Sequence, residues 1–272
     1  MEEDKELNLV DHLDELRKRL IVSVTAFLIF FIAGFVFVED IYHWFVRDLD
    51  VKLMVLGPSD IIWIYFMIAT VIALVGTIPV LALQIWMFVK PALKPIEKKL
   101  TLSYIPALFI LFIVGLAFGY LVIFPIIMDF LVQLGGDMVV TNFTAEKYFR
   151  FIMYTTLPFG FLFELPVVTM FLTSLGVINP YSLQKVRKYA YFVLVLVAVV
   201  ISPPDVMSDT IVSIPLLFLY EISINLSKIV YKRKLKKEKQ WEEEFEREGK
   251  EGEIQGESES ESKDNDDASK LG

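Results

Sequence analysis

The sequence has 272 residues, none of them cysteine, and only two histidines, His12 and His43. The lack of cysteine excludes disulfides, thiolate metal sites and cysteine nucleophiles. Glycine-rich phosphate loops, His-Glu-x-x-His pairs and Gly-x-Ser-x-Gly turns are also missing, so no familiar motif for nucleotide hydrolysis, metalloprotease or serine chemistry is present. We therefore predict no enzyme activity, no cofactor and no metal site.

Charge is nearly absent from six stretches of the chain, and apolar residues make up 55% of the whole sequence. A membrane-spanning helix needs about 20 apolar residues to cross about 30 Å of hydrocarbon. The first four stretches are long enough for this, whereas the last two are short. We predict an all-α integral membrane protein with six transmembrane helices, at about Leu20–Val38, Ile61–Val89, Leu102–Met128, Phe151–Leu175, Tyr189–Ile201 and Ile211–Ser227.

Prolines lie inside several of these stretches. Each removes a helical hydrogen bond and bends its helix, which favours a concave body over a straight bundle. The prolines are Pro79, Pro106, Pro158, Pro166 and Pro215.

Lysine and arginine concentrate at both ends and in alternate loops, while the loop between the last two spans has none. By the positive-inside rule, both termini are cytoplasmic. The net charge of −8 comes from the end of the chain, because residues 240–272 hold 13 acidic and 4 basic residues. We therefore predict a cytoplasmic N-terminal helix at 1–19, a membrane domain at 20–229 and a charged, largely disordered cytoplasmic tail at 230–272.

The N-terminal segment Asn8–Leu20 is amphipathic. Its leucines recur at spacings of four, three and four residues and line one helical face, while the other faces carry charge. Such a helix is predicted to lie flat on the membrane surface and to lead directly into the first span.

Two cytoplasmic carboxylates, Glu15 and Glu97, are candidates for binding a ligand with two adjacent arginines, since guanidinium groups bind carboxylates bidentately. Each also has a structural interpretation. Glu15 can pair with Arg19 one helical turn away, and Glu97 can be a favourable charge in the first turn of the third span.

Glu164 lies deep in the fourth apolar stretch, where a carboxyl group is costly unless it is paired or protonated. It is a candidate functional residue; alternatively, it repairs the Leu162 carbonyl that Pro166 leaves without a donor. Glu221 fits an interfacial or helix-pairing role. Asp205 and Asp209 lie in a loop without lysine or arginine, so they have no evident charge partner.

Several separated motifs resemble the TatC family, the signal-peptide receptors of the twin-arginine protein export pathway. Their order along the chain also matches, and the resemblance runs from about Asn8 to Ile229. One departure is Asp209, where many members carry glutamine. The motifs are His12-Leu-Asp-Glu-Leu-Arg-Lys-Arg-Leu20, Gln84-Ile-Trp-Met-Phe-Val-Lys-Pro-Ala-Leu93 with Glu97, Gly115-Leu-Ala-Phe-Gly-Tyr120 with Phe124-Pro125, Phe159-Gly160 with Phe163-Glu-Leu-Pro166, Ser202-Pro-Pro-Asp-Val-Met-Ser208, and Pro215 with Phe218-Leu-Tyr-Glu221.

The resemblance implies a glove-shaped receptor in a bacterial-type cytoplasmic membrane. Glu15 and Glu97 would bind the two arginines of signal peptides of folded cargo, with Phe88 and Arg17 at the same surface. The receptor would be multimeric and would recruit single-span TatA-type subunits, with a TatB-type subunit as a further candidate partner, for export driven by the proton-motive force. Glu164 and the facing last spans, with Asp205, Asp209 and Glu221, would dock these partners.

Two other functions fit parts of the sequence, and no nucleic-acid partner is expected. A proton- or ion-coupled transporter could use Glu164, Glu221, Asp205 and Asp209 as a relay. The sequence lacks the inverted repeat that favours such a function. A membrane-protein insertase could use Glu164 in a hydrophilic groove, although a basic residue would suit acidic substrates better.

Overall fold

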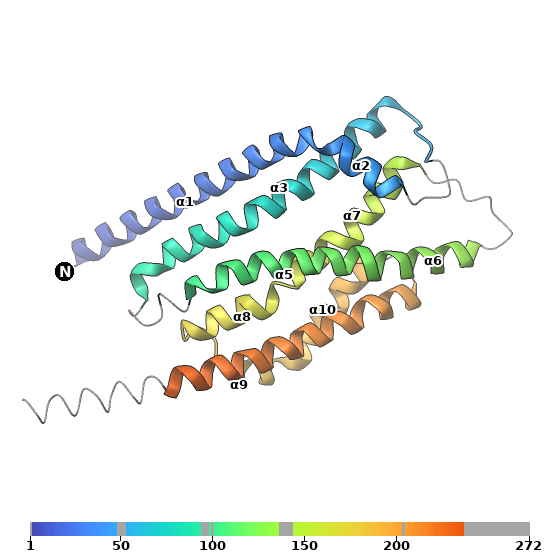
Figure 1. The fold of residues 1–272 in the computed structure, drawn as a ribbon. Helices are drawn as coiled ribbons and strands as arrows, with labels where there is room; N and C mark the ends of the chain where they lie inside the picture. Colours follow the sequence, from blue (N-terminus) through green and yellow to red (C-terminus); the bar gives the residue numbers. More distant parts are fainter. Residues whose placement is uncertain are drawn as a thin grey trace, which may run out of the picture. The chain divides into compact units, whose positions relative to one another are not determined.

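The computed structural model describes residues 2–47, 53–93, 98, 101–135, 144–202 and 205–236. The described residues are almost entirely helical (Figure 1). Residues Met1–Ser227 form one compact unit, and the contacts reported below lie within it. The elements are α1 (Glu2–Val36), α2 (Val38–Val46), α3 (Pro58–Val89), the short helical turn η1 (Lys90–Ala92), α5 (Tyr104–Phe118), the wider π-turn η2 (Gly119–Ile123), α6 (Phe124–Gly135), α7 (Ala145–Leu162), α8 (Leu165–Ser174), α9 (Pro180–Lys185), α10 (Arg187–Ile201) and a last helix, Val206–Lys236.

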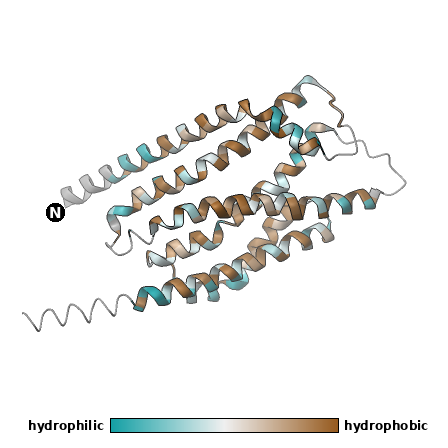
Figure 2. Ribbon diagram, viewed as in Figure 1, coloured by the Kyte–Doolittle hydropathy of each residue, from teal (hydrophilic) through white to brown (hydrophobic). Residues whose placement is uncertain are grey.

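Among the described residues, five helical segments are long and apolar enough to cross a membrane. Apolar residues dominate these helices, whereas polar residues gather in α1 just after its grey first turns and at the end of the last helix (Figure 2). The segments coincide with five of the six predicted spans: His12–Val36, Pro58–Val89, Tyr104–Leu134, Ala145–Ser174 and Val206–Lys236.

The predicted fifth span corresponds to α10, which has 15 residues. At 1.5 Å per residue such a helix is about 22 Å long, less than the hydrocarbon thickness. Six crossings therefore stay a prediction. The last helix has 31 residues, longer than its apolar run, because the basic segment after Ser227 continues it.

The predicted surface helix and the first span are one continuous helix, α1, of 35 residues. A direct connection between the two is what the sequence predicts, while the position of the amphipathic segment at a membrane surface stays a prediction. The physical reason for the continuity is local: no proline lies in α1, and its first glycine is Gly34. Without a helix breaker near Leu20, the chain continues straight into the span. Helix α1 packs along α3, as Figure 1 shows.

Pro166 divides the predicted fourth span into α7 and α8. Proline has no N–H to donate to the Leu162 carbonyl, so the helical ladder cannot continue through it. The turn tightens instead, with the Glu164 N–H donating to the Phe161 carbonyl at 3.1 Å, and α8 begins at Leu165. Pro79 and Pro158, by contrast, are accommodated inside α3 and α7. Glu164 therefore lies at the break between two helices.

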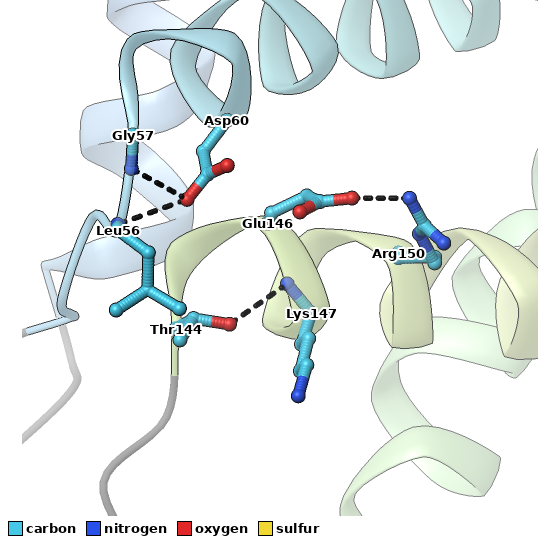
Figure 3. Close-up of polar contacts among 7 residues, drawn as sticks. All are labelled: Leu56, Gly57, Asp60, Thr144, Glu146, Lys147 and Arg150. Atoms are coloured by element: carbon cyan, nitrogen blue, oxygen red, sulfur yellow. Dashed lines mark hydrogen bonds and ion pairs between the residues drawn. The ribbon is translucent and has the colours of Figure 1, made fainter.

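Capping contacts hold the starts of α3 and α7, at the end of the unit predicted to be external (Figure 3), and one backbone hydrogen bond joins the segment before α3 to α7. The Ala145 N–H donates to the Met54 carbonyl at 2.8 Å. The Asp60 carboxylate accepts from the Leu56 and Gly57 N–H groups at 2.9 and 3.3 Å and caps α3. Glu146 pairs with Arg150 along α7. The residues just before α3 and the first turn of α7 are thus held by backbone and capping contacts.

Glycines allow α5 and α7 to approach closely. A Cβ atom added at Gly115 would lie 2.5 Å from the Phe159 carbonyl oxygen and 2.9 Å from the Gly160 Cα. Both contacts are with backbone, which cannot move aside without separating the helices. Close approach of this kind is typical of small residues between membrane helices.

We expect Gly115→Ala to destabilise the protein by about 1–3 kcal/mol, because overpacking forces backbone shifts. Gly76→Ala is the matched control in the same fold. Its added Cβ would meet the Phe30 ring at 2.6 Å, and a side chain can rotate away. Thermal unfolding of the purified protein in detergent measures the difference. Equal destabilisation by both variants would show that α5 and α7 separate as readily as Phe30 rotates.

Candidate functional site

A polar cluster joins the first part of α1 to the last turns of α3. Arg19 on α1 donates from Nη2 to Glu15 Oε1 at 3.1 Å and from Nη1 to Gln84 Oε1 at 3.2 Å. The same Nη1 lies 3.5 Å from the sulfur of Met87. Gln84 is buried at 8% exposure, whereas Glu15 and Arg19 are about one-third exposed. The ion pair expected from the spacing of Glu15 and Arg19 is therefore present, and it is anchored to α3.

An aromatic contact joins the same two helices one turn further along. The rings of His12 and Phe88 stack with centroids 4.2 Å apart and planes 20° from parallel. Two residues after Phe88, the Lys90 ammonium lies 5.2 Å from the centre of the Trp86 ring. The Trp86 indole N–H donates to the Thr101 hydroxyl at 3.0 Å. This surface, which we call the α1–α3 junction, comprises His12, Glu15, Arg19, Gln84, Met87 and Phe88.

Of the four predicted binding residues, two lie at the α1–α3 junction, one points away from it and one is outside the described residues. Glu15 and Phe88 both belong to the α1–α3 junction. Arg17 is on the opposite side of its turn, with its side chain 76% exposed and 3.8 Å from Asp14. Glu97 lies outside the described residues, so its position relative to Glu15 stays a prediction. The junction offers a carboxylate that is about one-third exposed, one helical turn from a stacked pair of rings. Carboxylates and aromatic faces are both groups that attract cations.

Glu164, at the break between α7 and α8, is 8% exposed. Within the described part of the chain, neither of its carboxylate oxygens has a hydrogen-bond partner. The predicted alternative, repair of the Leu162 carbonyl by Glu164, is therefore not among these contacts. Leaving a buried carboxyl group without a partner is unfavourable. Such an unsatisfied group inside a membrane helix is a candidate for binding a partner.

Glu221 has the helix-pairing role that the sequence suggested as one possibility. It accepts a hydrogen bond from Arg187 Nη2 on α10 at 3.0 Å and another from the Tyr191 hydroxyl. The Arg187 Nε lies 2.9 Å from the other carboxylate oxygen, so the two side chains also form an ion pair. Glu221 thus joins α10 to the last helix.

Asp205 and Asp209 have local partners at the start of the last helix. Asp205 accepts from the Ser208 N–H at 2.7 Å, and this hydrogen bond holds the pKa of Asp205 below its usual range. The Ser202 hydroxyl donates to Asp209 at 2.5 Å. Among the described contacts, none connects Glu164 to Asp205, Asp209 or Glu221. The four residues proposed as a proton relay are therefore not joined by hydrogen bonds in this part of the chain.

Two further observations bear on a transport pathway. A cavity of about 220 Å³ lies between α2, α3, α5 and α7, and its lining is apolar except for Thr156. Such a cavity provides no chain of polar groups for protons or ions. The described residues also contain no cluster of three acidic or histidine side chains that could hold a metal ion.

Sequence reasoning missed several members of these sites. His12 and Gln84 belong to recognisable motifs, but the spacing of residues does not predict that His12 contacts α3 or that Gln84 contacts α1. Gln84 gave one usable signal, since a polar amide inside an apolar run needs a partner. In the sequence, Arg187 is one of several loop charges, and its pairing with Glu221 depends on the return of the chain through α10.

Comparison with known proteins agrees with these features. Residues 11–215 match the family model described as Sec-independent protein translocase protein (TatC). The chain is 53% identical over 234 residues to the Sec-independent protein translocase protein TatCd of Bacillus subtilis, covering 86% of this chain and 97% of that protein. It is 42% identical over 235 residues to TatCy of the same organism, covering 85% and 92%.

A solved structure is also similar. The crystal structure of the twin-arginine translocase receptor TatC matches with a TM-score of 0.71 and 33% sequence identity, over 80% of this chain and 99% of that one. Sequence and fold agree over nearly the full length of the relatives. The chain therefore belongs to the TatC family of Sec-independent protein translocase proteins.

Proposed function

We propose that this protein is the membrane receptor that binds twin-arginine signal peptides at the α1–α3 junction. As a TatC-family member it is a protein translocase component and not an enzyme. The observation that carries the proposal is Glu15. This carboxylate is about one-third exposed, lies one helical turn from His12, whose ring stacks on Phe88, and already binds a guanidinium, that of Arg19. The site thus has the chemistry that an arginine pair requires.

A second carboxylate is needed for the second arginine. Glu97 is our candidate, because it follows the end of α3 by only eight residues and belongs to the motif that begins at Gln84. Phe88 supplies an apolar face for the peptide, and Arg17 adds a charge at the rim. We propose, as membership of this family implies, that folded cargo carrying such a peptide is then exported by the proton-motive force.

Glu164 is our candidate for docking TatA-type single-span subunits, with a TatB-type subunit as a further candidate. Its support is the pair of carboxylate oxygens without partners in the described region. The glove-like arrangement, the six spans and a multimeric receptor complex belong to the same proposal. A proton-coupled transporter is not favoured, since Glu221, Asp205 and Asp209 have local partners and the cavity lining is apolar.

Site-specific photocrosslinking tests the binding site. Photoreactive residues placed at Leu13, Leu16 and Ile96, next to Glu15 and Glu97, should crosslink to a twin-arginine signal peptide. The same probes should not capture a peptide in which both arginines are replaced by lysine. Positions on the last helix, such as Phe218, serve as controls within the same protein. Equal labelling by both peptides would contradict an arginine-specific site.

Topology gives an independent test. We expect both termini in the cytoplasm, because lysine and arginine concentrate at the ends and in alternate loops. Reporter fusions after Lys52, Gln133 and Ser208 should read as external, and those after Leu100 and Gly176 as internal. The fusion after Ser208 is decisive for α10, whose 15 residues are short for a crossing. A cytoplasmic signal at Gln133 would contradict the six-span arrangement.

A further inference from the structure

Arg19 already occupies the position that a ligand arginine would take at Glu15. Its Nη2 lies 3.1 Å from Glu15 Oε1, which is the contact proposed for the signal peptide. Its Nη1 is held by Gln84 at 3.2 Å and by the sulfur of Met87 at 3.5 Å. One guanidinium group of the protein is therefore fixed between α1 and α3, with its side chain 31% exposed.

We infer that Arg19 is a resident competitor, which neutralises Glu15 in the free receptor and must yield it when a twin-arginine peptide binds. The inference rests on the proposed function, because it requires Glu15 to bind an arginine of the peptide. The inference adds that Arg19 lowers the affinity of the site for the peptide below the affinity that Glu15 would give without it. The ion pair is then the resting state of the binding site as well as a structural contact.

Sharing Glu15 between two guanidinium groups is unfavourable. Two positive charges would lie a few ångströms apart with one carboxylate between them, and Arg17 and Lys18 add positive charge on the same turns. At that separation, the repulsion between the two guanidinium groups costs more free energy than Arg19 could contribute by holding the Glu15 side chain in one conformation. Removal of Arg19 should therefore strengthen peptide binding, whereas a purely orienting role would predict weaker binding.

Gln84 makes the displacement feasible. It is buried on α3 and contacts a different nitrogen of Arg19 from the one that contacts Glu15. When the peptide takes Glu15, Arg19 can keep its hydrogen bond to Gln84 and its contact with Met87. The displaced guanidinium then loses one contact and is not left without an acceptor.

The test measures binding of a fluorescent synthetic twin-arginine signal peptide to the full-length protein in lipid nanodiscs. We expect Arg19→Gln to lower the Kd about three- to tenfold, the range between an exposed helical ion pair and a partly buried charge-assisted contact. Lys18→Gln is the matched control, because it removes the same charge from the next residue, which is exposed. Its effect should stay below about twofold, since exposed charges are screened by salt.

Double substitution separates the two proposals. In a Glu15→Gln background, Arg19→Gln should bring no gain, because there is no carboxylate to release. If Glu15→Gln alone leaves the Kd unchanged, the proposed binding site is wrong. If Glu15→Gln weakens binding but Arg19→Gln gives no more than the Lys18→Gln effect, or weakens binding, the resident competitor is overturned and the site is not.

A second variant covers the case in which Arg19→Gln does not fold. Arg19→Lys keeps the charge, but one ammonium group cannot reproduce the fork that reaches both Glu15 and Gln84. It should lower the Kd by a smaller factor than Arg19→Gln. A raised Kd for Arg19→Lys would show that Arg19 orients Glu15 for the peptide and would overturn the inference.

Discussion

Replacement of both Glu15 and Glu97 by alanine is expected to abolish export of twin-arginine cargo while leaving membrane insertion intact. Each carboxylate lost removes one charge-assisted contact to an arginine, about 1.5–3 kcal/mol when partly desolvated. That corresponds to about ten- to a hundredfold in affinity for each single variant. Cargo processing in cells and peptide binding to the purified protein measure the two consequences.

Folding should be nearly unaffected by Glu15→Ala. An exposed pair at this spacing contributes only about 0.3–0.5 kcal/mol, and Arg19 keeps its hydrogen bond to Gln84. Asp14→Ala is the matched control, since it removes a carboxylate from the same turn. Asp14 is 62% exposed and lies 3.8 Å from Arg17. Full export by the Glu15→Ala, Glu97→Ala variant would mean that neither residue binds the peptide and that their structural interpretations are right.

The apolar spans were predictable because a long run of uncharged residues can be recognised in the sequence without knowing which helices it packs against. Five of the predicted spans coincide with long apolar helices in the described residues. The break between α7 and α8 was also predictable from Pro166, because proline acts on its own helix. The continuity of α1 follows in the same way from the lack of a helix breaker near Leu20. Amphipathic spacing marks a face of a helix but not where the helix ends.

Pairing between distant helices was not predictable in the same way. Glu221 and Arg187 are 34 residues apart, and Arg19 and Gln84 are 65 apart. Such contacts depend on which helix faces which, and the charge count of a loop carries no such information. For Glu15 the sequence identified the local partner, Arg19, but not the anchor on α3 that turns a surface pair into part of a site.

Glu164 gives the second prediction with a large expected effect. Its carboxyl group is buried at the break between α7 and α8, and its oxygens have no partner in the described part of the chain. A single-span TatA-type helix with one polar side chain near its outer end could supply the missing hydrogen bond, which would relieve the cost of burial. Removing the group should then weaken contact with that partner and leave the α1–α3 junction unchanged.

The comparison of Glu164→Gln with Glu164→Ala separates docking from proton transport. Glutamine has similar size and can still form hydrogen bonds, so partner contact should be retained, whereas alanine cannot form them and contact should fall several-fold for one lost hydrogen bond of about 1 kcal/mol or more. A proton relay predicts the opposite for glutamine, because an amide does not titrate.

The chain has no native cysteine, so single cysteines on α8 and on the small subunit report the contact as a disulfide crosslink. Signal-peptide affinity, measured on the same samples, should not change in either variant, since the proposed peptide site lies on α1 and α3. Equal crosslinking in the unsubstituted protein and in Glu164→Ala would remove Glu164 from the docking site, and loss of crosslinking in Glu164→Gln would favour the relay.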